Sequence, residues 1–344
     1  MGILKSMGKN PWGERLKKVR QSVNYVNGAF HNHHPVSLMG GVSGFFRIFF
    51  KFLNKPKTTR PPRILPSVKT DLKNLTNDGP VLVWFGHSSY LLKIAGKHIL
   101  VDPVFSGYAS PFRIGSAKSF EGTNVYAAED MPSIDVLLIS HDHYDHCDYK
   151  TILELHPKVK RIVTSLGVGS HLEYWGVDMH KVTELGWSEH LEMEGGIHIT
   201  AESARHFSGR GFKRAKTLWS SFVLKIAGVS IYIGADSGYD NHFKEIGEKH
   251  GPFELAILES GQYNEAWKSI HMMPEETVQA SLDVRARRLL PVHWGKFSLA
   301  LHPWNEPIER ILKKAEELKV EVSTPRIGEP WVIRGERLTN TWWR

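Results

Sequence analysis

The chain is expected to fold as an α/β protein in which two β-sheets are covered by helices. Short apolar segments bounded by turn residues recur between residues 81 and 258, as in strands. Segments with the length and apolar spacing of helices lie between these blocks. The chain has 344 residues, 41% of them hydrophobic, which is enough for a large core. These observations predict two packed sheets with helices outside them.

The individual elements follow from the pattern of apolar residues. The expected strands are 81–85, 90–94, 98–101, 136–139, 161–165, 198–201, 218–226, 229–233 and 255–258. The expected helices are 149–155, 240–249, 274–284 and 306–318. In the last helix, one face is formed by Ile308, Ile311, Leu312, Ala315 and Leu318.

The segment after strand 136–139 contains the densest cluster of ionisable side chains. It reads Ser140-His141-Asp142-His143-Tyr144-Asp145-His146. A buried strand that ends in three imidazoles and two carboxylates requires a neutralising partner, and a metal supplies one. Imidazole and carboxylate ligands without thiolates suit zinc, manganese or iron. The alternative is a surface turn rich in His and Asp, which the later ligand types disfavour.

Three later strand-like segments each end in a further ligand type. The run 197–201 leads to His206, the run 229–235 ends at Asp236, and the run 288–292 ends at His293. Each residue alone has an ordinary explanation, such as a structural histidine or a turn aspartate. In this order behind the first cluster, together they favour one shared metal site.

These motifs resemble those of the metallo-β-lactamase superfamily over residues 79–305. Within it, the similarity is to the branch with N-acyl-phosphatidylethanolamine-hydrolysing phospholipase D and the ascorbate-6-phosphate lactonases. The matching segments are 84–90, 100–105, 141–149, His206, 234–239 and 292–295, and the phospholipase likeness adds 270–272 and 296–300. The resemblance implies a metallo-β-lactamase-like four-layer αββα sandwich with the metals where strand ends from both sheets meet.

The resemblance also implies a ligand set for two divalent ions. The first ion would be held by His141, His143 and His206, and the second by Asp145, His146 and His293. Asp236 would bridge them. Zinc is expected, with manganese and iron as alternatives. A hydroxide between ions roughly 3.5–4 Å apart is a strong nucleophile near neutral pH, so no Ser or Cys nucleophile is required.

Other residues receive roles around this site. Asp145 and His271 are the candidate catalytic side chains, and the resemblance places His271 near a substrate phosphate, with core packing as the alternative. Asp102 is expected to orient a ligand imidazole, and Cys147 to be a small packing residue. Tyr149 is expected to approach the metals or the substrate. Two alternatives stay open. His87 is either part of the site or part of the scaffold, and Arg210 either binds a phosphate group of the substrate or is a solvated side chain.

The positive charge of the chain is concentrated near its start. Residues 1–70 contain 13 Lys and Arg and one acid, whereas the remaining residues have 31 basic and 35 acidic side chains. We expect residues 1–75 to form a basic and aromatic extension with a linker, and residues 76–344 to form the catalytic domain. The run 42–53 is aromatic with interspersed cations, and 55–62 reads as an extended linker. Residues 42–60 would contact an anionic membrane peripherally, and the Phe residues of the run 42–53 would alternatively pack on the catalytic domain as a lid. The two arrangements are compatible.

The leading function is a metal-dependent phosphodiesterase acting on a small-molecule or phospholipid substrate. A lactonase or ester hydrolase is the alternative enzyme. Nucleic acid is not expected as a partner, because the catalytic domain is net acidic. A metal-free interaction module and a di-iron redox protein are disfavoured by the ligand set. With no signal-peptide core, no apolar run of 18 residues and one cysteine, a cytoplasmic location is expected, with peripheral membrane contact as an addition.

Overall fold

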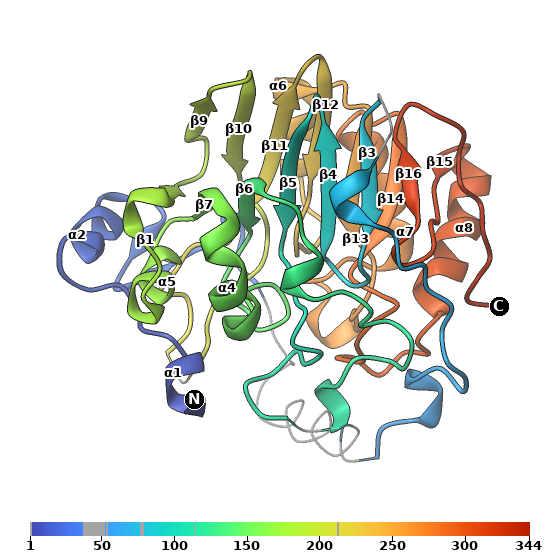
Figure 1. The fold of residues 1–344 in the computed structure, drawn as a ribbon, viewed down its shortest axis with the longest axis horizontal. Coiled ribbons are helices and arrows are strands. Elements are labelled where there is room, and N and C mark those ends of the chain that lie inside the picture. Colours follow the sequence, from blue (N-terminus) through green and yellow to red (C-terminus); the bar gives the residue numbers. More distant parts are fainter. Residues whose placement is uncertain (1, 37–51, 53, 76–78, 114, 212) are drawn as a thin grey trace.

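Two β-sheets lie face to face in the computed structural model, which describes residues 2–36, 52, 54–75, 79–113, 115–211 and 213–344 (Figure 1). The first sheet, in spatial order, is β16 (Pro330–Val332), β3 (Val81–Trp84), β4 (Tyr90–Ile94), β5 (Lys97–Val101), β6 (Ile134–Ile139), β7 (Val159–Ser165) and β8 (Val182–Leu185). The second is β15 (Glu321–Val322), β14 (Arg288–Val292), β13 (Leu255–Glu259), β12 (Val229–Ile233), β11 (Ser221–Ile226), β10 (Ile197–Glu202) and β9 (His190–Met193).

Helices cover the outer faces of both sheets. The first sheet carries α4 (Tyr149–Leu155) and α5 (Gly169–Trp175), and the second carries α6 (His242–His250), α7 (Pro274–Asp283) and α8 (Glu306–Leu318). Short 3-10 helices occupy Lys57–Thr59, Leu72–Asn74, Gly115–Ala117, Ala128–Asp130, His156–Lys158, Met179–Lys181 and Glu265–Trp267. The four-layer αββα sandwich expected from the sequence is therefore confirmed.

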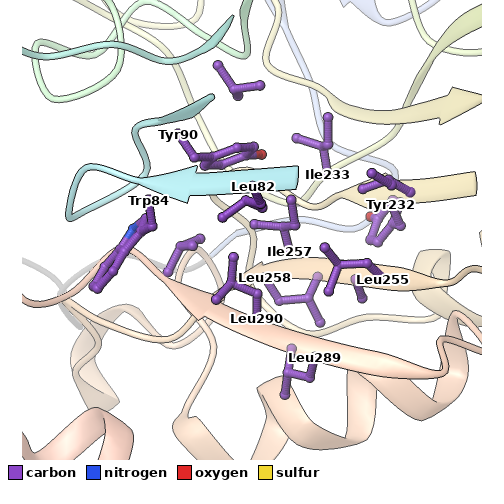
Figure 2. Close-up of a cluster of buried hydrophobic side chains, with 14 of the residues drawn as sticks. Leu82, Trp84, Tyr90, Tyr232, Ile233, Leu255, Ile257, Leu258, Leu289 and Leu290 are labelled. Atoms are coloured by element: carbon purple, nitrogen blue, oxygen red, sulfur yellow. The ribbon is translucent and has the colours of Figure 1, made fainter. Parts of the chain in front are cut away.

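Alternating side chains of each strand supply two separate cores. In β3, Leu82 and Trp84 face the second sheet, whereas Val81 and Val83 pack with the helices outside. Figure 2 shows Leu82 together with Ile257 and other residues of β12, β13 and β14 in the core between the sheets. Burial of each such side chain contributes about 1.5–3 kcal/mol, so this interior holds the strand ends in place.

The expected strands and helices match closely, with two informative differences. The segment 218–226 joins the sheet only from Ser221, because Leu218 N–H donates to Leu166 and Ser220 N–H to Ser140 instead. Within the two sheets and their covering helices, α5 and strands β8, β9, β15 and β16 were not expected. Among the described residues, no helix is long and apolar enough to span a bilayer.

Residues 2–36 pack directly against the two-sheet sandwich. They form α1 (Ile3–Ser6), α2 (Gly13–Gln21) and a hairpin of β1 (Tyr25–Val26) and β2 (Ala29–Phe30). Val19 and Phe30 are buried in a cluster with Leu166, Leu218 and Trp219. This segment is therefore continuous with the fold, although the division at residue 75 stays a prediction.

The aromatic run and the linker have different outcomes. Most of the run 42–53, and with it the choice between membrane contact and lid, lies outside the described residues; Phe52 is described and stacks on Trp267 with ring centroids 6.4 Å apart. The expectation of a wholly extended linker at 55–62 is wrong, because residues 57–59 form a 3-10 turn. Lys55 Nζ also donates to Ser298 O at 2.6 Å, and burial, with a smaller effect of Arg60, lowers the pKa of Lys55 to about 8.

Candidate metal centre

The candidate site lies where the strands of both sheets end. Strand β6 leads into His141, β12 into Asp236 and β14 into His293, while β10 leads through a short turn to His206. Strands β5 and β6 are parallel, as are β12, β13 and β14, so their carboxyl ends lie at the same edge. Polar side chains that follow such strands collect at that edge.

The first group of ligand-type residues is formed by His141, His143, His206 and Asp236. One ligand atom from each lies within 4.8 Å of those from the others. His141 Nε2 is 2.9 Å from His143 Nδ1, and His206 Nε2 is 3.3 Å from the same Nδ1. Three imidazole nitrogens therefore converge on one point that also faces the carboxylate of Asp236.

The second group is formed by Asp145, His146, His293 and His87, again within 4.8 Å. Asp145 Oδ2 accepts a hydrogen bond from His87 Nε2 at 2.9 Å, and the rings of His87 and His293 lie 4.0 Å apart. The question left open for His87 is thereby answered in geometric terms, because its side chain lies inside the cluster. Its residue type and its place after a strand were the only sequence signals.

Asp236 joins the two groups. Its Oδ2 is 3.1 Å from His146 Nε2, and its Oδ1 is 3.1 Å from His293 Nδ1. Burial alone would raise the pKa of this carboxyl, but the surrounding imidazoles, His146 above all, hold it well below its usual value. The structure thus brings all seven sequence-predicted ligands together, with Asp236 between the two groups.

The protonation of these side chains suits a bound cation. Burial, aided by neighbouring imidazoles, lowers the pKa of His141, His206 and His293 well below the usual value, which leaves neutral rings of the kind a metal requires. His146 is the exception. Burial opposes its charge, yet Asp236, Asp145 and Asp102 raise its pKa well above normal. Three carboxylates thus stabilise positive charge at this point.

Unsatisfied polar atoms also mark the site. Among the described residues, His87 Nδ1, His146 Nε2 and Asp236 Oδ1 are buried without a hydrogen-bond partner. Orphaned buried polar atoms are costly, and a metal ion would satisfy ligand atoms such as those of His146 and Asp236. The donor set of imidazoles and carboxylates, without thiolates, fits zinc, manganese or iron.

Hydrogen bonds around the cluster fix the ligand rings. Asp102 Oδ2 lies 2.8 Å from His146 Nδ1, which confirms the orienting contact expected for this carboxylate. Ser88 Oγ is 2.9 Å from His293 Nδ1, and the carbonyl of Ile270 accepts from His206 Nδ1 at 2.9 Å. Asn32 accepts from the backbone N–H of His206 and donates to its carbonyl, a contact that the sequence did not reveal.

Several of these residues adopt a strained backbone. His87, Asp102, Ala235 and His293 have φ values of 52°, 39°, 51° and 66°. Left-handed φ costs about 1–3 kcal/mol at a residue with a side chain, and such positions cluster at functional sites. Backbone hydrogen bonds between the two segments hold the strained residues His87 and His293 in place: His293 N–H donates to His87 O, and His87 N–H donates to Trp294 O, both at 3.0 Å.

Arg210 is neither a solvated side chain nor a free phosphate ligand. It is 4% exposed, and its guanidinium donates to the carbonyls of Asp142 and Cys147 at 2.7 Å and to that of Ser6 at 2.8 Å. Both expectations for Arg210 are therefore wrong, because it is enclosed by α1 and by residues 141–147, which we call the metal-binding segment. Cys147 is fully buried, as expected of a packing residue, and burial raises the pKa of its thiol to about 12.

Two further expectations concern the surroundings of the cluster. His271 lies beside the site, with its ring 5.2 Å from that of His293 and 5.0 Å from that of His206. Tyr149 begins α4, packs against Trp175 and lines a cavity of about 640 Å³ next to the metal-binding segment. The expected approach of Tyr149 to the metals or the substrate stays a prediction.

Comparisons with known proteins agree with this geometry. The sequence profile of the beta-lactamase superfamily domain matches residues 97–294. The chain is 32% identical to N-acyl-phosphatidylethanolamine-hydrolyzing phospholipase D 1 of Caenorhabditis elegans over 88% of this chain and 92% of that protein. It is 39% identical to an uncharacterized protein of Mycobacterium tuberculosis over 94% of this chain and 88% of that protein.

A solved structure shows the same fold. The metallo hydrolase Igni18 of Ignicoccus hospitalis superposes with a TM-score of 0.56 at 18% identity, covering 73% of this chain and 97% of that one. The chain belongs to the metallo-β-lactamase superfamily. It is a metal-dependent hydrolase of that superfamily, related to the N-acyl-phosphatidylethanolamine-hydrolysing phospholipases D.

Proposed function

We propose that the protein is a phosphodiesterase of the N-acyl-phosphatidylethanolamine phospholipase D type that uses two divalent metal ions, zinc by preference. The observation that carries this proposal is the position of His271. One ring nitrogen of His271 lies within 4.8 Å of ligand atoms of Asp236 and His293. His271 is nevertheless not one of the seven predicted ligands. A histidine in this place can contact an oxygen of a substrate that reacts at the metals.

The side chains divide the work between holding ions and holding substrate. His141, His143 and His206 would bind one ion, Asp145, His146 and His293 the other, and Asp236 both. The ions, when bound, supply Lewis acidity and activate water for attack. Asp102 contacts Nδ1 of His146, and Ser88 contacts Nδ1 of His293. These contacts fix the orientation of the two imidazole rings.

The phosphodiester assignment is supported by the relatives. Two proteins named as phospholipases D of this type, from Caenorhabditis elegans and Saccharomyces cerevisiae, are 32% and 33% identical to the chain in the matched regions. A lactone or carboxylic ester presents one carbonyl oxygen, whereas a phosphodiester presents two non-bridging oxygens that share one negative charge and that both metals and a histidine can contact. We therefore place phosphodiesters before lactones.

The bond that is cleaved provides the test. With the zinc-loaded protein, bis(p-nitrophenyl) phosphate and an N-acyl-phosphatidylethanolamine should both be hydrolysed, and a lactone panel should be hydrolysed far more slowly. In oxygen-18 water the label should appear in the phosphorus-containing product, because water attacks phosphorus. Chelation should remove the activity and zinc should restore it. Preferential hydrolysis of lactones, or label found only in the alcohol, would contradict the proposal.

A further inference from the structure

A buried carboxylate, that of Glu259, lies next to the ring of His271 and has no role in the proposed function. Glu259 is the last residue of β13, adjacent to the strand that leads into His293, and it is fully buried. In the part of the chain that the structure describes, His271 is the one basic side chain with which it forms an ion pair. A buried carboxylate with so little compensation is costly to retain, which indicates that it serves the site.

The two oxygens of Glu259 contact one short segment. Its Oε1 accepts the backbone N–H of Met272 at 2.6 Å, and its Oε2 lies 3.5 Å from His271 Nδ1. Within the described residues, neither Oε2 nor this Nδ1 has a hydrogen-bond partner elsewhere. The carbonyl of Ile270, in the same segment, receives the hydrogen bond of His206. Glu259 therefore holds the backbone beside a predicted metal ligand and faces the imidazole next to it.

We propose that Glu259 is a positioning residue that directs the Nδ1 edge of the His271 ring toward itself and so leaves Nε2 for the substrate. The proposal rests on the proposed phosphodiesterase function and deepens it. In a neutral histidine, the hydrogen bond made by one ring nitrogen decides which of the two nitrogens carries the proton. The same bond fixes the direction in which the other nitrogen points. The backbone N–H of Met272 occupies only Oε1 of Glu259. The other oxygen, Oε2, is therefore available to accept a hydrogen bond from His271 Nδ1.

One further contact agrees with this arrangement. The His271 ring is stacked on His293 with an interplanar angle of 19°, so the ring plane is fixed from one side while Glu259 fixes its edge.

A spectroscopic experiment tests the position of the ring without substrate. In the zinc-loaded protein, the His271 Nδ1–H proton should give a downfield signal in histidine ¹⁵N-correlated NMR, assigned by its loss in His271→Ala. The signal should disappear in Glu259→Gln, in which an amide faces Nδ1. It should remain in Glu202→Gln, a matched change of a buried glutamate that ends β10 and pairs with Lys249 and His250. Absence of the signal from the wild type, or its persistence in Glu259→Gln, would overturn the proposal.

Kinetics then separate positioning from a purely structural role. With bis(p-nitrophenyl) phosphate as substrate, Glu259→Gln should lower kcat about 10–100-fold at unchanged zinc content, the range typical of contacts that orient a working side chain. In a His271→Ala background, the same change should alter kcat less than about twofold, since it acts through His271. Equal losses in both backgrounds would refute the proposal. If the Gln variant does not fold, Glu259→Asp, with a shorter carboxylate, should show the same dependence on His271. A wild type inactive on phosphodiesters would refute the proposed function, while the NMR result would still decide the place of Glu259.

Discussion

Replacement of Asp236 by Ala should remove nearly all turnover and release metal. Its two oxygens are each 3.1 Å from a different imidazole, that of His146 and that of His293, and its side chain is almost fully buried. Loss of an orienting contact to a ligand costs about 10–100-fold in affinity or activity, and loss of a shared ligand should exceed this range. Metal content by plasma emission spectroscopy and turnover of bis(p-nitrophenyl) phosphate measure both effects.

The control for this change is Asp240→Ala. Asp240 is four residues away and pairs with His34 and Arg205 outside the ligand groups. It should retain the metal and most of the turnover. An Asp236→Ala protein with full metal loading and undiminished activity would refute the bridging position of this carboxylate.

Arg210→Met should produce the largest loss of stability. The guanidinium donates to three carbonyls from α1 and from both ends of the metal-binding segment, and it lies 4.0 Å from the ring of Tyr144. Each buried acceptor left without a donor costs about 1–3 kcal/mol. Methionine keeps the aliphatic volume but not the donors. The free energy of unfolding in urea should therefore fall by about 3 kcal/mol or more, and zinc affinity should fall with it.

Arg214→Met, four residues further along the chain, is the matched control. Arg214 is exposed. Among the described residues, the one side-chain interaction of its guanidinium is the contact with the ring of Phe207. Surface changes of this kind are usually within about 0.5 kcal/mol. If both substitutions had the same small effect, the role of Arg210 as the link between α1 and the metal-binding segment would be excluded.

The fold could be predicted well because its signals are local. Helices α4 and α8 begin and end at the residues expected, and β4 and β12 do as well. Period-2 and period-3.6 patterns report the burial of neighbouring residues directly. Strand β9 was missed because its side chains are mostly half-buried or exposed at the sheet edge, where the apolar pattern fades.

The candidate site was only partly predictable, for a different physical reason. Ligand types such as His206 and Asp236 stand at strand ends, and the order of the strands reveals them. The partners that hold them come from distant segments. Asn32 reaches His206 across 174 positions, and Arg210 reaches Ser6 across 204. Such contacts leave no periodic pattern, and the buried state of Arg210 follows from packing that no local rule describes.

Some of the positive charges near the start of the chain form ion pairs with acidic residues of the rest of the chain. Arg15, within the basic first segment, pairs with Glu184 at 2.7 Å and also with Glu173, both from the catalytic part. Part of the positive excess therefore serves to dock this segment against acidic side chains. The cations in the described part of the segment are thus not all available to an external partner.

The number and place of the metal ions are the most direct test of the central claim. Crystals of the zinc-loaded protein should show two peaks in anomalous difference density at the zinc absorption edge. One peak should lie among His141, His143, His206 and Asp236, and the other should contact Asp145, His146, His293 and Asp236. Peaks elsewhere, or none in this cluster at full zinc loading, would contradict the assignment of this site as the metal centre of the hydrolase.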